Sequence, residues 1–156
     1  IVSIGAFEHF GFDRYPDFFQ MAHDALPDDG VMLLHTICAF NPAKAKEAGI
    51  PVTFELARFV KFIITEIFPG GRLPSVEMVK EKAAEGNFTL TREQSLQLHY
   101  AKTLDIWAEK LQEHKDEAIA IQSEEVYERY MKYLTGCAKL FRARQTDVVQ
   151  FTLAKG

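Results

Sequence analysis

Hydrophobic and polar positions divide the first part of the chain into strand-like and helix-like segments. Residues 1–7 and 31–37 are short, almost continuous apolar runs, typical of strands covered on both faces of a sheet. Between them, residues 13–26 carry apolar side chains at helical spacing, and the turn residues 27–30 follow. Because the links are short, this order predicts a βαβ unit of a parallel sheet.

The rest of the chain predicts mainly helices. Segment 53–68 is apolar around most of its circumference, so we expect a helix that is buried or lines an apolar space. Ser123, with glutamates close behind it, predicts the N-cap of another helix that ends near residue 144. The other expected elements are helices over 75–86 and 99–120, a strand within 88–98 and a last strand over 147–153.

These elements predict an α/β fold with helical insertions over one end of the sheet. We assign residues 1–40, 87–98 and 145–156 to the sheet region, and residues 41–86 and 99–144 to the insertions. The chain of 156 residues is long enough for one domain with a sizeable core. It opens inside an apolar run without an initiator methionine, so we interpret it as a truncated chain.

Composition and charge exclude several classes of protein. The net charge is −4 with no run of like charges, which argues against binding of nucleic acid. No apolar stretch reaches the roughly 20 residues of a transmembrane span, and no signal peptide is recognisable. Two cysteines give no disulfide framework, which favours a reducing, cytoplasmic setting.

Two polar side chains lie at the ends of the predicted parallel strands. Glu8 comes directly after the first strand and His35 lies near the end of the second. Ligands of open parallel sheets bind beyond the carboxyl ends of the strands, so both residues are candidates for chemistry. Each also has an ordinary explanation, because Glu8 could be a turn or capping carboxylate and His35 a hydrogen-bonded core histidine.

The helices offer two further candidates with equally ordinary alternatives. Tyr100 shares a helical stripe with Leu104 and Trp107, so core packing is its default role. Cys137 follows Gly136 within a helix, where small residues usually mean close packing, and nothing nearby in the sequence lowers the pKa of its thiol. The five histidines show no metal-ligand spacing, and the sequence has no phosphate loop or nucleophile elbow.

Four longer segments together resemble the mycolic acid cyclopropane synthase family. They are residues Ile4–Gly11, Thr65–Pro74, Arg129–Cys137 and Thr146–Leu153. The resemblance runs along the whole chain, including the helical insertions. It implies the C-terminal part of a Rossmann-like class I S-adenosylmethionine-dependent methyltransferase. The glycine-rich cofactor loop of that family would lie upstream of Ile1.

The resemblance also implies roles for particular residues. The residues around a bound bicarbonate would be the side chains of Glu8, His35 and Tyr100 and the backbone of Cys137, with Tyr133 beside them. The cofactor would lie near Ile4, Gly5 and His9, and the acyl chain near Phe68, Leu73 and Trp107. No metal is implied.

The implied reaction is methyl transfer from S-adenosylmethionine to a double bond of a long mycolic acyl chain carried on acyl carrier protein. Bicarbonate would then take a proton from the new methyl group, and a cyclopropane ring would close. A related branch of the family adds a methyl branch and water instead, and departs from the pattern His35-Thr36-Ile37 that favours cyclopropanation here. A non-catalytic lipid-binding role stays open for the isolated chain, which we expect to be inactive and to bind S-adenosylmethionine weakly.

Overall fold

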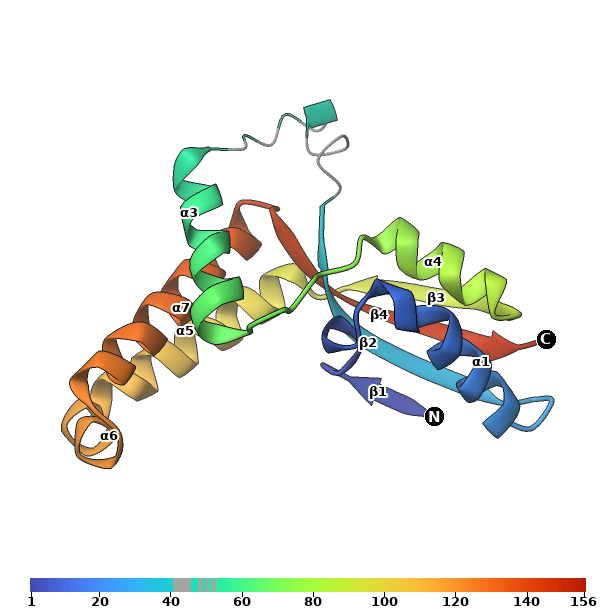
Figure 1. Cartoon of the computed structure of the whole chain (residues 1–156), viewed down its shortest axis with the longest axis horizontal. Coiled ribbons are helices and arrows are strands. Elements are labelled where there is room, and N and C mark those ends of the chain that lie inside the picture. Colours follow the sequence, from blue (N-terminus) through green and yellow to red (C-terminus); the bar gives the residue numbers. More distant parts are fainter. Residues whose placement is uncertain (41–45, 48, 50, 52) are drawn as a thin grey trace.

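A four-stranded sheet forms the centre of the computed structural model, which describes residues 1–40, 46–47, 49, 51 and 53–156 (Figure 1). The strands are β1 (Val2–Ile4), β2 (Val31–Ala39), β3 (Phe88–Ser95) and β4 (Thr146–Lys155), in the order β1-β2-β4-β3. β1 and β2 are parallel, whereas β4 runs antiparallel to both of its neighbours. The last strand of the chain therefore lies inside the sheet, next to the first βαβ unit.

The predicted βαβ unit is confirmed by β1, helix α1 (Tyr15–Ala25) and β2. The first strand is shorter than expected, because Gly5 turns the chain with a φ of 64° and a 3-10 helix, η1 (Phe7–His9), follows. The expectation that β1 is buried on both faces is wrong for the part of the chain that the structure describes. Val2 is 65% and Ile4 63% exposed, so no described element covers these side chains closely.

Helices α1 and α4 (Val76–Glu85) lie side by side over one face of the sheet (Figure 1). Phe7 stacks on Tyr15 at this face with ring centroids 3.8 Å apart, and both side chains are fully buried. Val79 of α4 is part of the same core. Thus α4, which lies within a predicted insertion, packs on the sheet and not over its end.

Three helices form an arm that projects from the sheet (Figure 1), namely α5 (Gln97–Glu113), α6 (Lys115–Ile121) and α7 (Glu124–Arg142). The Ser123 Oγ accepts a hydrogen bond from the Val126 N–H at 3.2 Å, which confirms the predicted cap. A single helix over 99–120 is wrong, because the chain breaks at His114 between α5 and α6. α5 and α7 pack together through a core that contains Leu104 and Leu134.

Helix α3 (Phe54–Phe62) crosses above α7 and continues as a turn of π-helix, η3 (Ile63–Ile67) (Figure 1). The expectation that segment 53–68 is buried is wrong for most of it. Phe62 is buried, but Phe54 is 79% exposed, because α3 contacts α7 along one side only. Residues 41–45, 48, 50 and 52 of the predicted insertion lie outside the described residues.

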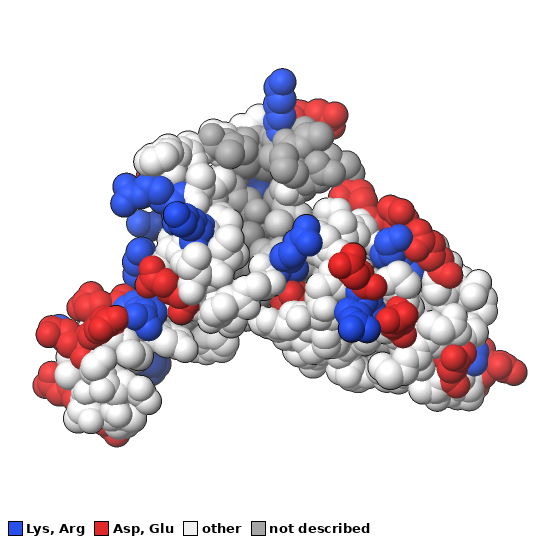
Figure 2. All heavy atoms as spheres, viewed as in Figure 1, with Lys and Arg blue, Asp and Glu red and all other residues white. Residues whose placement is uncertain are grey.

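The surface carries charges of both signs. On the face seen in Figure 2, acidic and basic side chains are interspersed over the sheet region, and basic ones gather around α3. Within the part of the chain that the structure describes, no helix is long and apolar enough to span a membrane. Among the same residues, no cluster of three or more His, Cys, Asp or Glu side chains is arranged to hold a metal ion.

Candidate functional site

Glu8 is a buried carboxylate at the end of the parallel strands. It is 5% exposed and lies in η1, directly after the fully buried Phe7. Burial of a carboxylate is costly unless hydrogen bonds compensate for the lost water. The Thr36 hydroxyl supplies such a bond by donating to Glu8 Oε2 at 2.7 Å. The Arg72 N–H also donates to the Glu8 carbonyl oxygen at 3.4 Å, which ties the loop after η3 to this position.

His35 comes directly before Thr36 on β2, so its side chain lies on the opposite face of the sheet. The expectation that His35 ends this strand is wrong, because β2 continues to Ala39. Gln150 of β4 is its cross-strand partner, and Gln150 Nε2 lies 3.2 Å from His35 Nδ1. Burial lowers the pKa of His35, and the negative charge of Glu8 acts in the opposite direction. The net effect is a lowered pKa, so the imidazole is neutral at pH 7.

Tyr100 of α5 approaches the same end of the sheet. Burial raises the pKa of its hydroxyl, and the charge of Glu8 raises it further. The Tyr100 ring packs edge-on against Phe141 at 5.2 Å and against Trp107 at 6.3 Å. Because the charge of Glu8 acts on both His35 and Tyr100, the structure brings these three predicted residues into one electrostatic neighbourhood.

Cys137 lies on α7 near Tyr100 and is packed into the core between α5 and α7. Burial raises the pKa of its thiol to about 12, so the sulfur stays protonated at neutral pH. A thiolate nucleophile is therefore disfavoured here. Cys137 lies within α7, where helical bonding occupies the backbone N–H, and its carbonyl oxygen retains a second lone pair.

Aromatic rings from three parts of the chain meet beside these polar groups. The Phe68 ring lies 5.6 Å from the His9 ring and 5.7 Å from the Tyr133 ring, both edge-on. The π-turn η3 ends immediately before Phe68, whose N–H donates to the Ile63 carbonyl at 2.8 Å. Burial raises the pKa of Tyr133, so its hydroxyl is neutral. These three rings form the aromatic wall of the site.

The other predicted substrate residues have different surroundings. Trp107 contacts Tyr100 and is 49% exposed, so the expectation that it belongs to an inward-facing stripe is only partly met. Leu73 lies in the loop between η3 and α4 and is partly exposed. The structure therefore brings Phe68 together with Tyr133 and His9, and Trp107 together with Tyr100.

Ile4 and Gly5, both predicted near the cofactor, form the tip of β1. The Gly5 N–H donates to the His35 carbonyl at 3.0 Å, so this tip is held against β2. Gly5 is in the left-handed region at a φ of 64°, a backbone conformation that would be strained for a residue with a side chain. Ile4 is 63% exposed. Among the described residues, no atom outside the two chain neighbours of Gly5 lies within 4 Å of where a Gly5 Cβ would be.

Sequence reasoning missed three side chains at this site. Thr36 holds Glu8, and Gln150 contacts His35. Tyr15 is fully buried with a hydroxyl that has no hydrogen-bond partner among the described residues, and burial and then the charge of Glu8 raise its pKa. Alternation along β2 places Thr36 on the buried face, but Gln150 is recognisable only once the antiparallel order of β4 is known.

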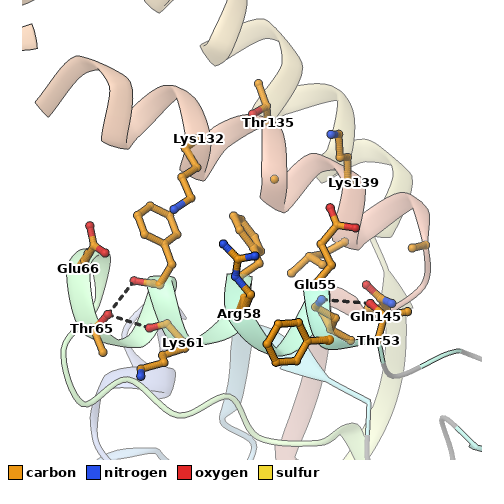
Figure 3. Close-up of a pocket in the computed structure, with 17 residues that line it drawn as sticks. Thr53, Glu55, Arg58, Lys61, Thr65, Glu66, Lys132, Thr135, Lys139 and Gln145 are labelled. Atoms are coloured by element: carbon orange, nitrogen blue, oxygen red, sulfur yellow. Dashed lines mark hydrogen bonds between the residues drawn. The ribbon is translucent and has the colours of Figure 1, made fainter. Parts of the chain in front are cut away.

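A separate groove of about 1030 Å³ lies between α3 and α7 (Figure 3). Its basic lining residues are Arg58, Lys61, Lys132 and Lys139. The residues that α7 contributes to it, such as Gly136, form a different stripe from Tyr133 and Cys137. None of the predicted site residues lines this groove, so it is distinct from the candidate site.

Comparison with known proteins places the chain in one family. The family model for mycolic acid cyclopropane synthetase matches residues 1–151. Cyclopropane mycolic acid synthase MmaA2 of Mycobacterium tuberculosis is 70% identical over 155 residues, which cover 99% of this chain and 54% of that protein. Methoxy mycolic acid synthase MmaA3 of the same organism is 62% identical, and the match covers 99% of this chain and 53% of that protein. The chain spans about half the length of the curated relatives it matches.

Solved structures agree with this relationship. The structure of MmaA2 from Mycobacterium tuberculosis matches with a TM-score of 0.97 at 70% identity, covering 99% of this chain and 54% of that one. The mycolic acid cyclopropane synthase CmaA1, complexed with SAH and CTAB, matches with a TM-score of 0.94 at 65% identity and the same coverage. The fold is shared with a phosphoethanolamine N-methyltransferase of Haemonchus contortus, which matches with a TM-score of 0.79 at 14% identity. That match covers 99% of this chain and 32% of the other. The fold is thus the α/β fold of S-adenosylmethionine-dependent methyltransferases, and the chain belongs to the mycolic acid cyclopropane synthetase family.

Proposed function

We propose that this chain forms the catalytic half of an enzyme that methylates a double bond of a long mycolic acyl chain and closes a cyclopropane ring. The observation that carries the proposal is the packing of His9, Phe68 and Tyr133 into one aromatic wall directly after the buried Glu8, whose charge acts on both His35 and Tyr100. A polar cluster next to aromatic faces suits a reaction that creates a positive charge on a hydrocarbon. Seventy per cent identity to a cyclopropane mycolic acid synthase supports the same reaction.

The reaction requires two groups that the family implies. When bound, S-adenosylmethionine supplies an electrophilic methyl group to the acyl double bond, and bicarbonate supplies the base that takes a proton from the new methyl group. Binding of SAH by CmaA1 supports the first of these assignments. The open backbone around Gly5 and the exposed Ile4 at the tip of β1 fit an adenosyl ligand that approaches the ends of the strands.

The residues also fit an anion with one hydroxyl group. The neutral imidazole of His35 and the Tyr100 hydroxyl are hydrogen-bond donors, and the Glu8 carboxylate is an acceptor. Bicarbonate carries acceptor oxygens for the two donors and one O–H for an acceptor. Glu8 would receive that O–H, so two negative groups would share a proton and repel one another less.

In this arrangement Glu8, His35 and Tyr100 hold the base in place, and the aromatic wall protects the positive charge on the acyl chain. Aromatic faces stabilise a desolvated cation by about 2 kcal/mol. They also exclude water, which would otherwise capture the cation. Because Phe68 lies between His9 and Tyr133, it is the residue that we expect to lie nearest the reacting part of the chain.

A second product class has its own supporting observation. MmaA3, a methoxy mycolic acid synthase, is 62% identical to this chain, so a product that carries a methyl branch and oxygen is the alternative. The pattern His35-Thr36-Ile37 favours the cyclopropane. We further propose that acyl carrier protein presents the acyl chain and that the enzyme works in the cytoplasm.

A chimaera tests the proposal because the chain matches a defined part of MmaA2. Replacing that part of MmaA2 by residues 1–156 should give an enzyme that transfers methyl groups from S-adenosylmethionine to an unsaturated acyl substrate. In the chimaera, Glu8→Gln should lower turnover by about 10²-fold, because the base would lose a group that positions it, while cofactor affinity stays unchanged. Glu128→Gln, the same change at an exposed position of α7, is the matched control. Unchanged turnover of Glu8→Gln beside an active parent would contradict the proposal.

A further inference from the structure

His35 and Gln150 face one another across two antiparallel strands. They are paired in the β2–β4 register, so their side chains lie on the same face of the sheet. Gln94 of β3 is paired with Gln150 from the other side, which makes a row of three side chains across the sheet. The two glutamines differ in their contacts. Gln150 Nε2 lies 3.2 Å from His35 Nδ1, whereas Gln94 Oε1 accepts from the Arg92 guanidinium at 2.6 Å.

This contact indicates which ring nitrogen of His35 carries the proton. An amide nitrogen has hydrogens and no lone pair to offer, so Gln150 Nε2 is the donor and His35 Nδ1 the acceptor. In a neutral imidazole, an accepting Nδ1 requires that the proton is on Nε2. Burial lowers the pKa of His35, which favours the neutral ring that this reasoning requires.

We propose that Gln150 is a positioning residue that holds His35 in the Nε2–H tautomer, so that Nε2 donates a hydrogen bond to the anion at the candidate site. The identity of the anion rests on the proposed function, whereas the tautomer does not. The opposite tautomer would direct a lone pair at a negative group and repel it. Gln150 thus acts through His35 and touches neither the anion nor the acyl chain.

Nitrogen NMR measures the tautomer directly. The chain is labelled with ¹⁵N-histidine, and the His35 ring is assigned by its loss in His35→Asn. Two-bond correlations between ring protons and nitrogens distinguish an Nε2–H from an Nδ1–H imidazole. We expect Nε2–H in the unchanged chain, with the Nδ1 resonance shifted by its hydrogen bond.

Three variants separate positioning from simple packing. In Gln150→Leu, the Nδ1 resonance should move towards the value of an acceptor without a hydrogen bond. In Gln150→Glu, a carboxylate accepts where the amide donated, so the ring should change to Nδ1–H or become protonated. Gln94→Leu, the same residue type in the same row of the sheet, should leave the His35 spectrum unchanged. All three should keep the circular dichroism of the parent chain.

Transfer assays then connect the tautomer to the reaction. In the MmaA2 chimaera, Gln150→Glu should lower methyl transfer tenfold or more, part of the roughly 10²–10⁴-fold that positioned acid–base groups contribute. An Nδ1–H ring in the unchanged chain would overturn the proposal, and so would a His35 spectrum that is the same in both Gln150 variants as in the unchanged chain. An inactive parent chimaera together with the expected spectra would reject the proposed function and still support the tautomer.

Discussion

Removal of the Thr36 hydroxyl offers a quantitative test of how the fold tolerates a buried carboxylate. Thr36 is fully buried, and its hydroxyl donates to Glu8 Oε2 at 2.7 Å. Thr36→Val keeps the shape of the side chain and deletes the donor. Hydrogen bonds to charged groups contribute about 1.5–3 kcal/mol, so we expect the free energy of unfolding to fall by that amount. For a chain of 156 residues, each kcal/mol lowers Tm by roughly 2–4 °C, which gives a decrease of about 3–12 °C.

A double-mutant cycle separates this bond from general disturbance of the core. Glu8→Met replaces the carboxylate with an apolar side chain of similar length, and the third variant carries both changes. Replacing both partners of a buried hydrogen bond by apolar groups costs less than the two single changes together. Chemical denaturation of all four proteins should therefore give a coupling energy of about 1–3 kcal/mol.

Thr36→Ser is the matched control, because it keeps the hydroxyl and loses one methyl group. It should cost about 1 kcal/mol from lost apolar burial, with no loss of the bond to Glu8. A coupling energy below about 0.5 kcal/mol, the range of independent sites, would refute the reasoning. Glu8 would then not depend on Thr36, and another group would have to compensate for burial of the carboxylate.

Three further predictions concern the folded chain alone. Burial lowers the pKa of His35 below its ordinary 6.5, so the unfolded chain binds more protons than the folded chain in acid. Thermal melts should therefore show stability that falls as the pH drops below 6.5, and that falls less steeply in His35→Asn. Burial raises the pKa of both Cys38 and Cys137, so iodoacetamide at pH 8 should label the folded chain far more slowly than the unfolded chain by mass spectrometry, and equal rates would contradict this. A Cβ on Gly86 would lie 2.6 Å from the Cβ of buried Phe19. Gly86→Ala should therefore lower the free energy of unfolding in urea by about 1–3 kcal/mol, and an unchanged value would show that α1 can shift to make room.

Local patterns predicted the parts of the fold that depend on neighbouring residues. The βαβ unit and the cap at Ser123 follow from apolar runs and side-chain chemistry close in sequence. The position of β4 between β2 and β3 could not be read this way, because pairing between residues more than a hundred positions apart leaves no local signal. The break at His114 was missed as well, since Lys and Glu on both sides continue a helical composition.

At the candidate site, too, local patterns predicted some residues, whereas others depend on pairing between distant strands. Glu8 and His35 could be found because Glu8 follows a recognisable strand and His35 is a polar residue within one. Gln150 could not, since a glutamine in a terminal strand looks like an ordinary half-exposed residue until β4 is paired with β2. The exposure of α3 was also beyond the sequence, because an apolar stretch does not say whether a partner surface covers it. Resemblance to the family supplied the roles that neither pattern nor position could give.

The fate of the transferred methyl group tests the central claim most directly. The MmaA2 chimaera that contains residues 1–156 is incubated with S-adenosylmethionine carrying a fully deuterated methyl group and with an unsaturated acyl substrate. Mass spectrometry of the product counts the deuterium that remains. Ring closure removes one proton from the new methyl group, so we predict a cyclopropane that retains two deuterons. A product that retains all three, as a methyl group beside a hydroxyl, would contradict the account.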